Sequence, residues 1–304
     1  MTKFWMTGLT AATFTPFHAN GSLNLAIVPN IVDQLINDGV KGLYVCGSTG
    51  EGVSLTREER MATAEAHIKA SHGRIPVIVQ VGHTSLAEAK LLAQHAQQAG
   101  ADAISATPPT YFKPHNTANL IDCLAEVISG APDLPFYYYH IPPMTGVNID
   151  MAAFLQGCKA RLPSMVGVKF SSSNVSEMQT GIMFDAGRYN FLFGSDEMLF
   201  SGLAAGAQGA VGSTYNLAAP LYNRIIAAFN RGDFAQARQL QGQAVAMVNI
   251  AIRYTAMPAL KAMMGMIGLD VGSTRLPLPQ LTAQETEALR TELTQIGYFD
   301  WGRK

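Results

Sequence analysis

The sequence has few cysteines and no long apolar run. Its 304 residues include three cysteines, Cys46, Cys123 and Cys158. Their odd number and wide spacing, without a Cys-x-x-Cys pair, argue against a disulfide framework. No run of 18 apolar residues is long enough to cross a bilayer, and the first seven residues lack the apolar segment of a signal peptide. We therefore expect a soluble cytoplasmic protein with reduced thiols and no membrane partner.

Charge is scarce and evenly balanced. Charged residues make up 14% of the chain, and 21 basic against 22 acidic side chains give a formal net charge of −1. Neither sign gathers into a block, which argues against a nucleic-acid partner. No Walker loop and no Gly-x-Gly-x-x-Gly motif follows a predicted strand, so a nucleotide cofactor is unsupported. The seven histidines never stand at the i, i+4 spacing of a helical metal site, which disfavours a metal.

The chain alternates short apolar strands with longer helical patterns. The predicted strands are Leu9–Phe14, Gly42–Cys46, Val77–Val81, Ala103–Ala106, Phe136–Tyr139, Val166–Phe170, Phe191–Phe193 and Ala210–Gly212. Hydroxyl or amide residues three positions before a glutamate predict helix starts at Thr56, Ser85, Asn174 and Thr282.

Eight βα units without a composition break predict one domain, residues 1–304, with an α/β fold of the (β/α)8 TIM-barrel type. A doubly wound open sheet is the alternative. Residues 1–216 would form the barrel core. Residues 217–304, which read as helix only, would supply the last barrel helix and a C-terminal helical extension.

Lys169 is the most informative residue, because it lies in the apolar run 165–170. Strand alternation directs Val166 and its alternate neighbours toward the outer helices, and Gly167 and Lys169 into the barrel. Desolvation disfavours the ammonium, and a partly neutral amine attacks carbonyl carbon, as in Schiff-base enzymes. The alternative is a lysine that extends its ammonium to water. Tyr139 ends the adjacent strand at the edge where barrel enzymes hold their active sites, which favours a functional lysine.

Two further strands end in polar loops. Gly47-Ser48-Thr49-Gly50-Glu51 follows the second strand, and its hydroxyls and amides suit a carboxylate or phosphate, although an ordinary βα turn has the same composition. Phe193-Gly194-Ser195-Asp196-Glu197 closes the seventh strand. Its adjacent carboxylates suit a metal, acid-base work or sugar hydroxyls, with a solvated loop as the alternative. The small-residue segment 205–213 predicts close packing of the eighth strand, with Ser213 at its end.

Four motifs together resemble one family. They are Gly47-Ser48-Thr49-Gly50-Glu51, Tyr139-His140-Ile141-Pro142, Gly167-Val168-Lys169 and Gly209-Ala210-Val211-Gly212-Ser213. Their order is that of the pyruvate-dependent class I aldolases, the dihydrodipicolinate synthase and N-acetylneuraminate lyase family, and the resemblance covers essentially the whole chain. Segments 136–142 and 212–216 are similar to the lyases. Met144 stands where the synthases carry an arginine for their dicarboxylate substrate.

The resemblance implies a role for each matched residue. Lys169 would be the Schiff-base lysine, and Tyr139 the phenol that shuttles the proton. Ser48 and Thr49 would hold the pyruvate carboxylate. Thr49 and Tyr111, the latter from the neighbouring subunit of a homotetramer, would form the hydroxyl relay that polarises Tyr139. The Ser171 hydroxyl would lie near the substrate. The positions that would face the sugar hydroxyls are Gly194, Asp196, Glu197 and Ser213.

The resemblance also implies an activity. The chain would cleave the sialic acid N-acetylneuraminate reversibly to N-acetylmannosamine and pyruvate, with no metal and no organic cofactor. One alternative is another pyruvate-dependent aldolase that acts on a 2-keto-3-deoxy sugar acid. Further alternatives are a dihydrodipicolinate synthase and a non-catalytic barrel that only binds a keto acid.

Overall fold

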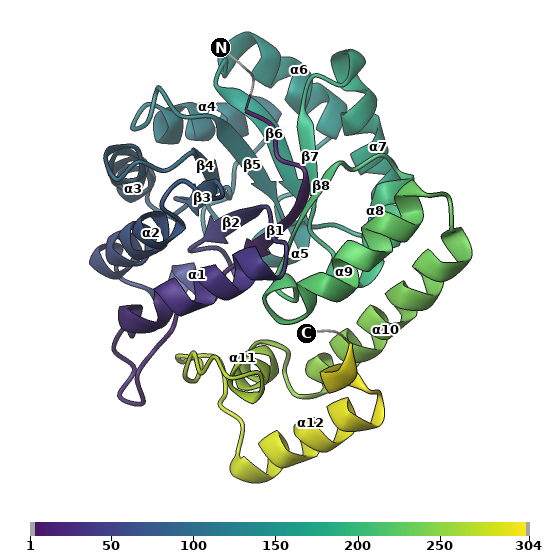
Figure 1. The fold of residues 1–304 in the computed structure, drawn as a ribbon. Helices are drawn as coiled ribbons and strands as arrows, with labels where there is room; N and C mark the ends of the chain where they lie inside the picture. Colours follow the sequence, from purple (N-terminus) through teal and green to yellow (C-terminus); the bar gives the residue numbers. More distant parts are fainter. Residues whose placement is uncertain (1–3, 302–304) are drawn as a thin grey trace.

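The structure, a computed structural model, describes residues 4–301. Eight parallel strands close into a barrel in chain order, and helices surround it (Figure 1). The predicted (β/α)8 barrel is confirmed, and every predicted strand is present with its ends within two residues of the expected ones. The strands are β1 (Gly8–Ala12), β2 (Gly42–Val45), β3 (Val77–Gln80), β4 (Ala103–Ala106), β5 (Phe136–His140), β6 (Met165–Phe170), β7 (Asn190–Phe193) and β8 (Gly209–Gly212).

Twelve α-helices and five 3-10 turns connect and follow the strands within the described part of the chain. The α-helices are α1 (Val28–Asn37), α2 (Arg57–Ser71), α3 (Leu86–Gln98), α4 (Thr117–Ile128), α5 (Pro142–Thr145), α6 (Met151–Arg161), α7 (Val175–Met183), α8 (Leu199–Ala204), α9 (Tyr215–Asn230), α10 (Phe234–Arg253), α11 (Met257–Met266) and α12 (Ala283–Gln295). The 3-10 turns are η1 (Leu25–Ile27), η2 (Gly52–Ser54), η3 (Phe184–Ala186), η4 (Asp196–Met198) and η5 (Tyr298–Asp300).

All four predicted helix starts are confirmed. Each predicted cap accepts the backbone N–H three residues ahead of it. Thr56 and Thr282 also form complete capping boxes with the glutamate at that position, which satisfies two otherwise unpaired backbone donors. None of the helices between residues 4 and 301 has the length and apolar character needed to cross a membrane.

The side chains of each strand alternate between an apolar cluster inside the barrel and a second one between the barrel and its helices. One residue, Val166, departs from the predicted alternation. The inward cluster fills the barrel with Met6, Ala12, Tyr44, Ile78, Ala103, Tyr137, Tyr139, Leu192 and Val211. Phe136 pairs with Met165 but Tyr137 pairs with Gly167, so the register shifts by one residue at Val166. Val166 therefore packs against the inward cluster, and its predicted outward orientation is wrong. Beyond the shift alternation resumes, and Lys169 points inward as predicted.

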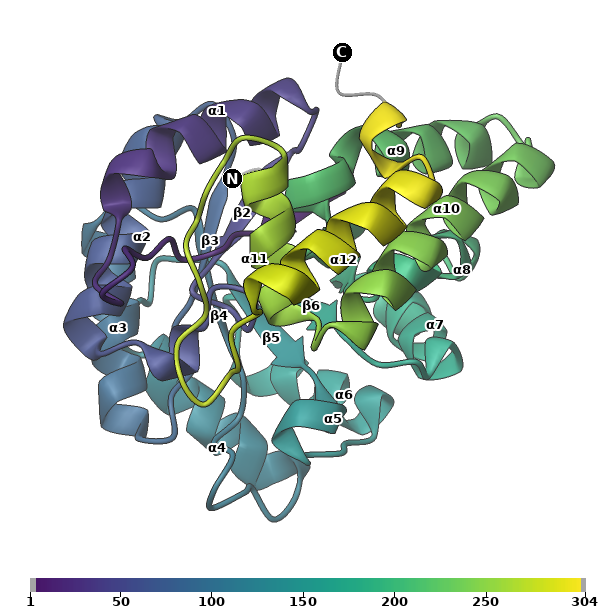
Figure 2. The same cartoon turned by 90° about the horizontal axis from the view of Figure 1, so that it is seen from below.

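The helices after β8 extend the barrel on one side. α9 packs against β1, while α10, α11 and α12 lie outside the ring of barrel helices (Figures 1 and 2). The connection between α11 and α12 runs back toward α2 (Figure 2), where the Arg275 guanidinium contacts the Glu59 carboxylate at 2.6 Å. This connection brings the C-terminal extension close to the loop that follows β2.

Candidate active site

Lys169 is buried between two aromatic rings near the C-terminal end of β6. Its Nζ lies 3.9 Å from the ring centre of Tyr44 and 4.0 Å from that of Tyr139. The side chain is 4% exposed. Burial lowers the pKa of the ammonium below its ordinary 10.5, and this effect outweighs Tyr139 and Asp196, which act in the opposite direction. The amine is thus more readily available in its neutral, nucleophilic form than that of a surface lysine.

Two hydroxyl pairs join the loop after β2 to other strands. Ser48 Oγ lies 3.3 Å from the Tyr139 hydroxyl, and Thr49 Oγ1 lies 2.6 Å from Ser213 Oγ. Thr49 is buried, whereas Ser48 is exposed at the mouth of the barrel. Five predicted site residues are thus brought together at the C-terminal ends of β2, β5, β6 and β8. Hydroxyls and a phenol around a buried amine can bind a carboxylate and move a proton.

The loop after β2 has a conformation that its glycines permit. Cys46 and Glu51, which flank it, both have left-handed backbones with φ of 60° and 51°. A Cβ on Gly52 would lie 1.9 Å from the Cys46 carbonyl oxygen, and one on Gly47 would lie 2.7 Å from the Tyr44 ring. The chain therefore folds sharply back onto β2 and presents its two hydroxyls toward the barrel axis.

The adjacent carboxylates after β7 have different environments. Asp196 is buried, and its Oδ2 accepts the backbone N–H of Thr214 at 2.8 Å and the Thr214 hydroxyl at 2.6 Å. Burial raises the pKa of this carboxyl to about 6. Glu197 is exposed and has no hydrogen bond or ion pair with another residue of the described chain. Of the two carboxylates, Glu197 is the one that is free to reach a ligand from solvent.

Gly194 and Ser171 lie side by side near these carboxylates. A Cβ on Gly194 would lie 2.0 Å from Ser171 Oγ, so the absence of a side chain makes room for that hydroxyl. Both residues are half-buried, as is Ser213.

Tyr111 has no contact with Lys169 or its neighbours in the described part of this chain. It follows β4, is 80% exposed, and its ring contacts the neighbouring Phe112 ring with centroids 5.1 Å apart. It makes no hydrogen bond with the described residues, so within one chain its hydroxyl does not extend the relay.

Tyr44 was absent from the predicted site, although its ring covers the lysine amine. The ring is fully buried, and its hydroxyl donates to Ser105 Oγ at 3.0 Å. Burial raises the pKa of this phenol well above its ordinary 10. Strand alternation was the signal available, because Leu43 and Val45 face the outer helices and leave Tyr44 pointing inward.

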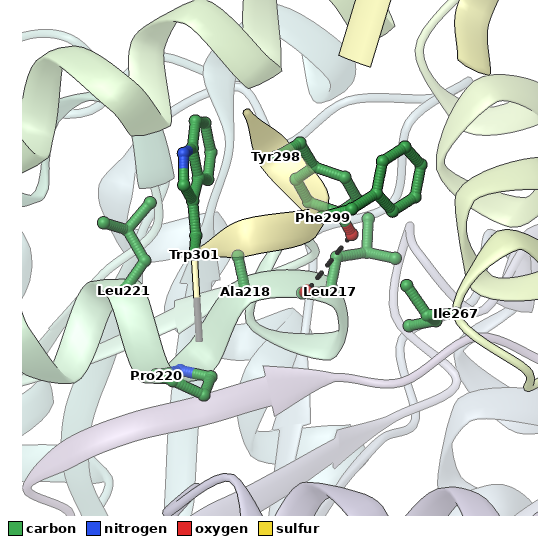
Figure 3. Close-up of a pocket in the computed structure, with 8 residues that line it drawn as sticks. All are labelled: Leu217, Ala218, Pro220, Leu221, Ile267, Tyr298, Phe299 and Trp301. Atoms are coloured by element: carbon green, nitrogen blue, oxygen red, sulfur yellow. Dashed lines mark hydrogen bonds between the residues drawn. The ribbon is translucent and has the colours of Figure 1, made fainter. Parts of the chain in front are cut away.

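A separate apolar pocket lies between the start of α9 and the C-terminal turn η5 (Figure 3). The Tyr298 hydroxyl donates to the Leu217 carbonyl across it at 3.2 Å. No predicted site residue lines the pocket. Its side chains pack η5 against the start of α9, a few residues after Ser213. It is lined by Leu217, Ala218, Pro220, Leu221, Ile267, Tyr298, Phe299 and Trp301.

The described residues include no cluster of side chains suited to bind a metal ion. No three side chains from His, Cys, Asp and Glu between residues 4 and 301 gather closely enough to hold an ion. The groups that the structure brings together around Lys169 are the amine, the phenol and the hydroxyls.

A buried lysine on the sixth strand of a closed barrel, beside a phenol and paired hydroxyls, suits a barrel enzyme of the Schiff-base class. Comparison with known proteins agrees with this class. The dihydrodipicolinate synthetase family matches residues 5–296, and the chain belongs to that family.

Individual relatives are similar over nearly their whole length. An N-acetylneuraminate lyase of Danio rerio is 39% identical over 95% of this chain and 95% of its own. The solved structure of a Proteus mirabilis N-acetylneuraminate lyase is 38% identical and superimposes with a TM-score of 0.94, covering 97% of this chain and 100% of the other. A Bacillus anthracis dihydrodipicolinate synthase is 28% identical with a TM-score of 0.89, over 95% and 97% of the two chains.

Proposed function

We propose that the chain, acting as a single domain of residues 1–304, is an N-acetylneuraminate lyase. The observation that carries this proposal is the buried Lys169 amine between the rings of Tyr44 and Tyr139, with the paired hydroxyls beside it. The similarity to lyases over nearly the whole chain supports the choice of substrate.

The reaction begins at Lys169. Its neutral amine attacks the C2 ketone of the open-chain sugar. The C2 hydroxyl then leaves as water with the proton of the Tyr139 phenol, which gives a protonated imine and a Tyr139 phenolate. The imine withdraws the electron pair of the C3–C4 bond as that bond breaks, so an enamine forms instead of an unstabilised carbanion. The C4 hydroxyl loses its proton to Tyr139 and becomes the aldehyde of N-acetylmannosamine. Protonation of the enamine at C3 and hydrolysis then release pyruvate and restore the amine.

The hydroxyls around the lysine orient the substrate. Ser48 and Thr49 hold the carboxylate next to the C2 ketone, with Ser213 bonded to Thr49 at 2.6 Å. Ser171, Gly194, Asp196 and Glu197 face the sugar hydroxyls and set the specificity. No metal or organic cofactor has a step in this reaction.

We propose further that Tyr111 acts in a neighbouring subunit of a homotetramer. Its 80% exposure leaves its hydroxyl free to enter another site. The Phe112 ring, 82% exposed with its centroid 5.1 Å from that of Tyr111, adds a second exposed aromatic side chain at the same place. A cytoplasmic location is part of the proposal, and the three free cysteines support it.

A dihydrodipicolinate synthase is the less favoured member of the family. Met144, which is 71% exposed on α5, offers no charge to a dicarboxylate substrate. An aldolase for a shorter 2-keto-3-deoxy sugar acid would use the same lysine, and its substrate differs chiefly in lacking the glycerol tail.

Borohydride trapping tests the proposal. Pyruvate with borohydride should leave a reduced adduct on Lys169, located by peptide mass spectrometry. Lys261 is an internal control, because it is equally buried but its ammonium is 2.6 Å from the Glu51 carboxylate. Lys169→Arg should fold and form no adduct, since a guanidinium stays protonated. An adduct on a different lysine, or none in the parent chain, contradicts the mechanism.

A further inference from the structure

The turn that carries Ser48 and Thr49 is fastened by a buried ion pair to the C-terminal extension. Lys261 Nζ on α11 lies 2.6 Å from Glu51 Oε1, and both side chains are 1% exposed. The other oxygen of the Glu51 carboxylate, Oε2, accepts the backbone N–H of Arg275 at 2.9 Å. Both oxygens of the side chain at the end of the turn are therefore held by the extension.

Lys261 also binds the chain that leaves β1. In addition to its ion pair with Glu51, its ammonium donates hydrogen bonds to the carbonyls of Thr15 at 3.0 Å and Ser273 at 3.1 Å. The Thr15 hydroxyl in turn donates to the Gly50 carbonyl at 2.6 Å. The turn is thus bound at Glu51 by the ion pair and at Gly50 by the Thr15 hydroxyl. The Lys261 ammonium takes part in both, because it contacts Glu51 directly and also binds the Thr15 carbonyl.

The backbone of the turn requires such support. Glu51 has φ of 51°, a left-handed conformation that a residue with a side chain adopts rarely and that persists where its surroundings impose it. Stability alone does not explain the ion pair, because apolar side chains in place of a buried pair are often at least as stabilising. What the pair supplies in addition is a definite position for the turn.

We propose that Lys261 and Glu51 are positioning residues for the carboxylate-binding hydroxyls. They hold the turn so that Ser48 Oγ stays 3.3 Å from the Tyr139 hydroxyl and Thr49 Oγ1 stays 2.6 Å from Ser213 Oγ. The inference rests on the proposed function, in which Ser48 and Thr49 bind the pyruvate carboxylate. The C-terminal extension then takes part in substrate binding without placing a side chain against the substrate.

Glu51→Gln tests the inference with little change in shape. Glutamine keeps the acceptor for the Arg275 N–H and removes the charge that pairs with Lys261. The pyruvate concentration that gives half-maximal borohydride trapping should rise about tenfold or more, as expected when a charge-assisted contact is lost. The trapping rate at saturating pyruvate should stay within about threefold, since Lys169 itself is not displaced.

Glu59→Gln is the matched control. It breaks the 2.6 Å contact between Arg275 and Glu59, which fastens the same connection to α2 and not to the turn. Glutamine also serves in the capping box at this position, so α2 keeps its start. The pyruvate concentration that gives half-maximal trapping of Glu59→Gln should stay within about twofold of the parent value. This should hold even if the urea midpoint of unfolding of Glu59→Gln falls as far as that of Glu51→Gln.

Lys261→Met and the double variant Glu51→Gln/Lys261→Met complete the series. Lys261→Met alone leaves the buried Glu51 carboxylate unpaired. The double variant removes both charges of the pair, so it can be tested if the single variant does not fold. Weaker pyruvate binding in the double variant supports positioning. Parent-like binding in the folded variants, or equal weakening in Glu59→Gln, overturns it. A parent chain that traps no pyruvate overturns the lyase proposal and this inference together, whereas a parent that traps pyruvate leaves the lyase proposal standing whichever way the variants fall.

Discussion

Glu197 tests the choice of substrate most directly. It lies in η4 just after β7, is exposed, and has no hydrogen bond or ion pair with another residue between positions 4 and 301. Its neighbour Asp196 is by contrast buried and bonded to Thr214. Truncating Glu197 should therefore leave folding unchanged, so a loss of kcat/KM in Glu197→Ala reports contact with the substrate.

The size of the loss follows from the kind of contact. A hydrogen bond to a charged carboxylate contributes about 1.5–3 kcal/mol, and each 1.4 kcal/mol is roughly tenfold in kcat/KM. Glu197→Ala should thus lower kcat/KM for N-acetylneuraminate by about one to two orders of magnitude. A short 2-keto-3-deoxy sugar acid lacks the glycerol tail, so its turnover should barely change. Pyruvate trapping at Lys169 should also be unaffected.

A pyruvate-release assay on both substrates measures these effects. Glu287→Ala is the matched control, because it removes another exposed carboxylate, on α12 outside the barrel. The reasoning fails if Glu197→Ala loses both substrates equally, or if it no longer forms the imine. Glu197 would then be structural or catalytic, and the case for a sialic acid over a shorter substrate would be lost.

Two further predictions concern the hydroxyl pair and a buried histidine. Thr49→Val removes the hydroxyl that lies 2.6 Å from Ser213 Oγ, so kcat/KM should fall about ten- to hundredfold while trapping at Lys169 persists at higher pyruvate; unchanged kcat/KM would exclude Thr49 from the site. Burial lowers the pKa of His140 from 6.5 to about 4, so the folded chain holds it neutral and its contribution to stability is present above pH 6.5 and lost as the pH falls toward 4. Between pH 7 and 4.5, the free energy of unfolding of His140→Asn, measured in urea, should therefore fall less than that of the parent, by about 2 kcal/mol. The raised pKa of Asp196 acts in the opposite direction but is common to both chains, so equal losses in the two chains would refute the prediction.

Much of the fold was predictable because its signals are local. The eight strands follow from short apolar runs, and the helix starts follow from a cap and a glutamate three residues apart. The inward position of Lys169 follows from alternation along β6. Alternation failed at Val166, because the register shift between β5 and β6 depends on how two strands pair and not on either strand alone.

The site itself was only partly predictable. The paired carboxylates after β7 look equivalent in sequence, yet Asp196 is buried against Thr214 and Glu197 faces solvent. Tyr44 carries no motif, and its place over the lysine depends on the closure of the barrel, which brings β2 and β6 to face each other across the interior.

The sequence by itself determined the strands, the helix starts and the inward lysine, because each depends on residues within a few positions of one another. Only the tertiary structure decided which distant groups meet. Thr49 reaches Ser213 because the barrel closes between β1 and β8, and Glu51 reaches Lys261 because the C-terminal extension folds back over the turn. Such contacts depend on the relative placement of whole elements, and neither their distances nor the burial that changes a pKa is encoded in any local pattern.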